Sequence, residues 1–161
     1  MNTRKNKTAS VDWSKLADLA EFRYQIRRFI SFSETVCERA GISAQQYQLL
    51  QVVATVPEGQ ESSISYIAER MVVRHNTAVE LVDRAERSGL VQRVSDPEDH
   101  RRSLVETTAR GNELLAQLVP LHLAEMRTEN GDLLRSLETL IGSKASSSKR
   151  EQKDESRRIS V

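Results

Sequence analysis

Apolar side chains recur at three- and four-residue steps along residues 11–39, from Leu16 to Cys37. This period places side chains on one face of an α-helix. Gly41 follows at once, and glycine is typical of the position just after a helix ends. The pattern therefore predicts one long amphipathic helix over residues 11–39.

Two shorter helices are predicted next. Ser43 and Gln46 have the spacing of a capping box, and the apolar residues after them continue the helical period to about Thr55. Ser63 can cap the following helix, in which apolar residues up to Met71 share one face.

A fourth helix follows a tight link at residues 72–75. Asn76 can cap this helix, the apolar residues after it recur at helical spacing, and Gly89 ends the helix behind Ser88. Two short helices joined by a tight turn form a helix-turn-helix unit.

A β-hairpin is predicted behind this unit. Residues 90–94 and 103–107 alternate between apolar and polar side chains, as half-buried strands do. The turn signature Asp96-Pro97-Glu98-Asp99 lies between them. A helix-turn-helix followed by a hairpin is the order of a winged helix-turn-helix, which we place at residues 43–107.

The rest of the chain returns to a helical period. Thr107 or Thr108 can cap a helix whose apolar positions continue to Met126, and Pro120 inside it predicts a kink or a break. A last helix is predicted to end at Gly142.

Together these elements predict a mainly α fold with a small β-hairpin wing, in which N- and C-terminal helices flank the winged helix-turn-helix. We expect one domain over residues 11–142. Residues 1–10 and 143–161 are basic and lack a sustained apolar period, so both are expected to be disordered tails.

Composition indicates the class of protein. With 38% hydrophobic and 29% charged residues the chain resembles ordinary soluble proteins. No apolar run approaches the ~20 residues of a membrane span, and the N-terminus lacks the apolar stretch of a secretion signal. Cys37 is the single cysteine, which excludes an internal disulfide and favours a reducing compartment. We therefore expect a cytoplasmic protein that does not enter a membrane.

The net charge of +1 hides two basic tails around an acidic middle. Residues 11–142 carry 15 basic and 20 acidic side chains, and residues 64–110 hold eight Arg and eight Asp or Glu. A chain that gripped DNA by bulk charge would be more basic. Any DNA binding must therefore rest on a few placed side chains and on the tails.

A winged helix-turn-helix reads DNA by placing its second helix in the major groove, while the hairpin can reach the adjacent minor groove. Asn can read adenine, Arg is the commonest reader of guanine, and Glu can accept from cytosine or repel phosphates. The candidate DNA-binding residues on this helix are Arg74, His75, Asn76, Thr77, Glu80 and Arg84.

The wing tip supplies the second set of candidates. Arg101 and Arg102 lie at a projecting turn rich in acidic residues. A carboxylate two residues before an arginine can brace its guanidinium and so lower the entropic cost of ordering it for the minor groove. Asp99 has that position relative to Arg101.

Residues 42–111 resemble the MarR (multiple antibiotic resistance regulator) family. The segments that carry the resemblance are Ile67-Ala68-Glu69-Arg70, the run from Leu81 to Val91, Asp96-Pro97-Glu98-Asp99-His100-Arg101, and Thr107-Thr108-Ala109-Arg110-Gly111. The Asp-x-Arg of the wing is the most specific of these features. The resemblance implies that Arg101 enters the minor groove while Asp99 holds it, and that the chain dimerises through residues 11–39 and 112–142.

Two residues depart from the family pattern. Val72 stands where the family usually has glycine, and because a β-branched residue disfavours positive φ, we expect a slightly different turn there. Glu80 stands where relatives are often basic, so the family's DNA-site preference does not carry over to this chain.

The resemblance also implies an effector cavity between the dimerisation helices and the winged domain. Trp13, Tyr24, Arg27 and Arg28 on the first helix are the candidates to line it, with the two arginines facing an anionic ligand. In the alternative interpretation the aromatic residues form the dimer core, and the arginines pair with acidic residues or lie in solvent.

The sequence as a whole predicts a homodimeric DNA-binding transcriptional regulator, a repressor whose affinity for a pseudo-palindromic site is modulated by a small ligand. We expect no enzyme and no cofactor, because no catalytic constellation is present, and the spacing of His75, His100 and His122 does not support a metal site. Two alternatives remain: a redox-sensing regulator acting through Cys37, and a winged-helix module that binds proteins and not DNA.

Overall fold

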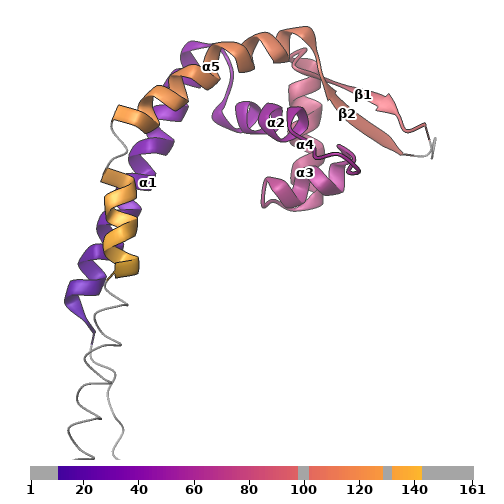
Figure 1. Ribbon diagram of the computed structural model, residues 1–161. Coiled ribbons are helices and arrows are strands. Elements are labelled where there is room, and N and C mark those ends of the chain that lie inside the picture. The colour runs from indigo at the N-terminus through magenta and orange to yellow at the C-terminus, as the bar shows by residue number, and fades with distance from the viewer. Residues whose placement is uncertain (1–10, 98–101, 129–131, 143–161) are drawn as a thin grey trace, which may run out of the picture. The chain divides into compact units, whose positions relative to one another are not determined.

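The computed structural model describes residues 11–97, 102–128 and 132–142. The elements follow in the order α1 (Trp13–Arg39), α2 (Ala44–Ala54), α3 (Ile64–Arg70), α4 (His75–Arg87), β1 (Val91–Ser95), β2 (Ser103–Thr107) and α5 (Ala109–Thr128) (Figure 1). Residues 132–142 are helical as well. The predicted fold class, mainly α with a two-stranded wing, is confirmed. Asp99, His100, Arg101 and both predicted tails lie outside the described residues.

The chain divides into two compact units. One is Ser31–Ala124, and the other combines Met1–Ile30 with Glu125–Val161. The first unit contains the whole winged helix-turn-helix together with the end of α1 and most of α5. Within the described parts of both units, no helix is long and apolar enough to cross a membrane.

The predicted capping residues of the second and third helices are both confirmed. The Ser43 hydroxyl accepts a hydrogen bond from the Gln46 amide, and the Ser43 amide donates to Gln46 Oε1, which completes a capping box at the start of α2. The Ser63 hydroxyl accepts from the Tyr66 amide at 3.3 Å and caps α3.

The predicted start of α4 is wrong. Arg74, not Asn76, is the N-cap: its backbone is extended (φ −70°, ψ 152°), and its carbonyl accepts the first helical hydrogen bond, from Ala78. The Val73 amide donates to the Ala68 carbonyl and closes the preceding turn, so the chain enters α4 two residues earlier than expected. Asn76 therefore lies within the first turn of α4.

The link between α3 and α4 passes through a left-handed backbone at Val72, whose φ is 54°. The sequence predicted an altered turn here because valine disfavours this region. Val72 nevertheless adopts the conformation usual for glycine, with its side chain 90% exposed. The turn therefore keeps its geometry at the expense of local strain.

The wing is an antiparallel pair, in which Val91 lies opposite Thr107 and Arg93 opposite Val105. Val91 and Val105 are buried. The Val105 amide also donates to the Ser62 carbonyl at 3.1 Å, which attaches the segment before α3 to β2. Main-chain bonds thus connect the base of the wing to the helix-turn-helix.

The buried core of this unit draws apolar side chains from every element between the end of α1 and the middle of α5. Its largest fully buried members are Tyr47, Leu49, Leu50, Ile67, Leu90, Leu118, Val82, Val91 and Val105. Because α4 and β1 both contribute to this core, the second helix of the helix-turn-helix and the wing share one rigid support.

The start of α5 confirms the predicted cap at Thr108, whose hydroxyl accepts from the Gly111 amide and donates to the Gly89 carbonyl. Of the predicted kink or break at Pro120, the break is wrong, since α5 continues through this residue to Thr128. A proline removes one main-chain hydrogen bond, and a helix that is packed against the core on either side tolerates that loss.

Candidate nucleic-acid interface

The helix α4 is anchored by one face and exposed on the others. Its buried residues are Ala78, Leu81, Val82 and Ala85. The sequence-predicted contacts Arg74, His75, Asn76, Thr77, Glu80 and Arg84 are all exposed. The structure thus brings these six candidates together at the N-cap and along the exposed side of α4, with the core holding the opposite side.

The start of α4 has a polarity suited to a phosphate. Arg74 makes no side-chain cap hydrogen bond, so the first amides of the helix have no side-chain acceptor there. The partial positive charge of a helix N-terminus favours an anion. In the part of the chain that the structure describes, Arg74 and Arg84 also make no ion pair, which leaves both guanidinium groups available.

Arg102, a predicted DNA contact, is held by two acidic residues. One guanidinium nitrogen lies 2.5 Å from Glu61 Oε2 and another lies 3.4 Å from Asp96 Oδ2. Asp96 is fully buried, and its amide donates to the Arg102 carbonyl at 3.1 Å. Asp96 and Arg102 therefore close the wing at the base of its tip, while Asp99 and Arg101 lie in the part that is not described.

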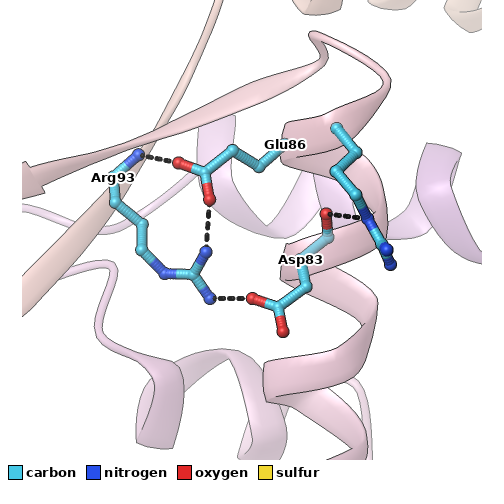
Figure 2. Close-up of polar contacts among 4 residues, drawn as sticks. Asp83, Glu86 and Arg93 are labelled. Carbon is cyan, nitrogen blue, oxygen red and sulfur yellow. Dashed lines mark hydrogen bonds and ion pairs between the residues drawn. The ribbon is translucent and has the colours of Figure 1, made fainter.

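A second cluster, whose residues are not among the predicted contacts, joins β1 to α4 (Figure 2). The Arg93 amide donates to Glu86 Oε1 at 3.0 Å, and its guanidinium donates to Glu86 Oε2 and, at 2.6 Å, to Asp83 Oδ1. Burial works to lower the pKa of Arg93, but the hydrogen bonds and charges of Asp83 and Glu86 outweigh it and raise the pKa. Arg93 is therefore a permanent cation fixed between two carboxylates.

The sequence does hold a signal for this cluster. Arg93 is two residues after the buried Val91, so both point to the same side of the strand. A charge at an inward-facing strand position requires a partner. Asp83 and Glu86, three residues apart on α4, are spaced to supply it.

A third cluster surrounds His122 within the Ser31–Ala124 unit. Its Nδ1 lies 2.9 Å from the Leu118 carbonyl oxygen, and its Nε2 lies 2.9 Å from Ser33 Oγ. Tyr47 stacks on the imidazole with 4.5 Å between ring centroids, and Phe32 meets it edge-on. His122 is therefore a buried packing residue that joins α1, α2 and α5.

Cys37 is fully buried in the same region. Burial raises the pKa of its thiol, against a smaller opposing effect of a hydrogen bond with Ser33. Since the thiolate is the reactive form, this environment argues against Cys37 as a redox sensor.

The predicted effector residues all lie in the first part of α1. Trp13 is 74% exposed, and Tyr24, Arg27 and Arg28 are exposed as well. Arg28 donates a long hydrogen bond of 3.5 Å to Gln25. The predicted effector cavity stays a prediction.

Part of the chain is similar in sequence to known transcriptional regulators. Residues 40–102 match the model of the MarR family. Over 96 residues the chain is 32% identical to a proposed transcriptional regulatory protein for the hcr operon of Thauera aromatica, a match covering 60% of this chain and 56% of that protein. Over 84 residues it is 32% identical to the transcriptional regulator HosA of Escherichia coli O111:H-, covering 52% and 60%. The chain thus spans less than two thirds of these relatives.

Solved structures share the fold over a longer stretch. AbsC, a MarR family transcriptional regulator from Streptomyces coelicolor, has a TM-score of 0.70 at 20% identity and covers 88% of this chain and 99% of its own. Sco3205 from the same organism, solved in complex with DNA, has a TM-score of 0.62 at 17% identity and covers 96% and 89%. At these identities the likeness establishes the fold.

Proposed function

We propose that this chain is a sequence-specific DNA-binding transcriptional regulator, a proposal supported by the match of residues 40–102 to the model of the MarR family. The observation that carries the proposal is the exposed side of α4, which together with the N-cap residue presents six polar side chains while its other face is buried in the core. A helix supported in this way fits the major groove.

In the proposed complex, α4 lies in the major groove with its N-terminal turn toward the bases. Asn76 reads adenine and Arg74 reads guanine. Glu80 excludes some sequences by accepting from cytosine and repelling phosphates. His75, Thr77 and Arg84 complete the contacts.

The wing is proposed to reach the adjacent minor groove. Arg101 enters it and Asp99 orders the Arg101 side chain. Arg102 is already paired with Glu61 and Asp96, but a guanidinium has five N–H donors. The Arg102 guanidinium can therefore donate to a phosphate while it keeps its ion pairs with Glu61 and Asp96.

The proposed assembly is a homodimer formed through residues 11–39 and 112–142. Large apolar side chains are exposed on these segments, among them Leu16, Leu19, Ile30, Leu134 and Ile141. Large apolar side chains left exposed in the single chain are typical of an interface, which supports the proposed dimer. A two-fold dimer would place two α4 helices in successive major grooves, about 10 base pairs apart, on a pseudo-palindromic site.

The proposed output is repression in the cytoplasm, relieved or strengthened by a small ligand. Trp13, Tyr24, Arg27 and Arg28 are proposed to contact that ligand. A ligand that favours one spacing of the two α4 helices changes DNA affinity by the difference in its affinity for the two states.

Selection of DNA sequences from a random pool with the full chain tests this proposal. We expect enrichment of a pseudo-palindrome with half-sites about 10 base pairs apart, bound in a salt-dependent manner. Failure to enrich any sequence, with no salt-sensitive binding, would instead favour a winged-helix module that binds proteins.

A further inference from the structure

Arg93 is the residue through which the wing is tied to α4 by side-chain charge (Figure 2). Three of its donors, one in the main chain and two in the guanidinium, are used by Asp83 and Glu86. The side chains of Arg93, Asp83 and Glu86 are 28%, 47% and 38% exposed. This is a half-buried network and not an isolated pair on the surface.

The two acidic partners have different places on α4. Asp83 follows Glu80 by three residues and Asn76 by seven, so the three share the face that points away from the core. Glu86 lies on the side of α4 that meets β1. Arg93 thus connects the wing strand to the same helix face that carries the proposed base contacts.

We propose that Arg93 is a positioning residue, which fixes the wing relative to α4 so that both can engage DNA at once, and which does not itself contact DNA. The inference rests on the proposed function. Its physical basis is that all three of these donors already point at α4, so the strand cannot shift along the helix without breaking bonds to both carboxylates. A fixed wing removes part of the entropic cost of binding two grooves together.

The test measures the affinity of the full chain for its selected DNA sequence at several salt concentrations. Four proteins are compared: wild type, Arg93→Gln, the double variant D83N/E86Q, and the triple variant that combines them. Thermal unfolding of each establishes that the compared proteins are folded at the temperature of measurement.

A positioning role predicts three results together. Arg93→Gln weakens binding about tenfold. D83N/E86Q also weakens it, although this variant removes two negative charges from a DNA-binding domain. The triple variant binds no more weakly than either parent, and the slope of log affinity against log salt stays at the wild-type value.

A direct phosphate contact from Arg93 predicts the opposite pattern. The salt slope of Arg93→Gln would then fall by about 0.9, and D83N/E86Q would bind more tightly because repulsion is relieved. That pattern, or an unchanged affinity of folded Arg93→Gln, overturns the proposal.

Two controls sharpen the comparison. Arg93→Lys keeps a cation but loses the planar fork, so it is expected to recover part of the affinity. If Arg93→Gln does not fold, Arg93→Lys is measured in its place: a loss smaller than tenfold is expected, and the weakening of binding in D83N/E86Q then distinguishes a positioning role from a phosphate contact. Arg110→Gln removes the same charge from an exposed position at the start of α5, outside the proposed DNA contacts and dimerisation segments, and is expected to change affinity less than about twofold.

Amide hydrogen exchange separates this inference from the proposed function. Arg93→Gln is expected to speed exchange in residues 91–95 and 103–107 while α4 stays protected. If the wild-type chain binds no DNA, the proposed function fails, and unchanged exchange in the wing would independently show that Arg93 does not fix it.

Discussion

Val72 has a left-handed backbone conformation, which is strained for valine, and its side chain is exposed. No burial of apolar surface therefore offsets the strain. Val72→Gly removes that strain, and we expect the free energy of unfolding to rise by about 1 kcal/mol, net of the added flexibility of the unfolded chain. Urea denaturation measures it. Val73→Gly, at a neighbour without positive φ, is the matched control and should destabilise. Equal or lower stability of Val72→Gly would show that the turn is not strained.

Gly111 owes its place to a close approach of two backbones. A Cβ there would lie 2.3 Å from the Leu90 carbonyl oxygen and 2.8 Å from Leu50 Cδ2. Since the carbonyl belongs to the main chain that leads into β1, Gly111→Ala must displace the base of the wing, and we expect a loss of about 2–4 kcal/mol. Gly142→Ala, where a Cβ meets nothing within 4 Å, is the control. A wild-type melting temperature for Gly111→Ala would contradict the packing.

The buried Cys37 predicts a pH dependence of stability. Burial raises the pKa of the Cys37 thiol from its ordinary value of 9.0. The pKa of the Tyr47 hydroxyl is raised from 10.0, mainly by burial and secondly by the charge of the nearby Cys37. Both groups ionise more readily in the unfolded chain, so their contribution to stability is complete below pH 9 and is lost as the pH rises. The free energy of unfolding should therefore fall above about pH 9, less steeply in Cys37→Ala. Identical slopes for the two proteins would show that the thiol is not shielded.

At the scale of elements, the sequence predicts those helix ends that depend on hydrogen bonds between residues close together in the chain. The caps at Ser43 and Ser63 depend on an amide three residues away, so they could be read from spacing. The cap at Asn76 was wrong because the main-chain bond from Val73 to Ala68 sets where α4 begins. The Arg102–Glu61 pair joins residues 41 positions apart, and no local pattern shows which of eight arginines meets which acid.

At the scale of the whole molecule, the proposed DNA binding depends on where individual charged side chains lie and not on an excess of positive charge. The winged segment is formally neutral over residues 64–110. Arg93 and Arg102 of the wing are paired with acidic residues, while Arg74 at the N-cap of α4 and Arg84 within α4 are free of ion pairs among the described residues. We therefore expect weak binding to arbitrary DNA and a large preference for the proper site.

Asn76, in the first turn of α4, is the residue at which the proposed reading of base sequence can be tested. The most direct measurement compares wild type and Asn76→Ala for affinity to the selected DNA site and to a scrambled duplex, both at ~150 mM salt, where phosphate contacts are weakened. We expect Asn76→Ala to lose about 10- to 100-fold in affinity for the selected site, the worth of one bidentate base contact, with little change in affinity for the scrambled duplex. Equal affinity of the two proteins for the selected site would contradict it.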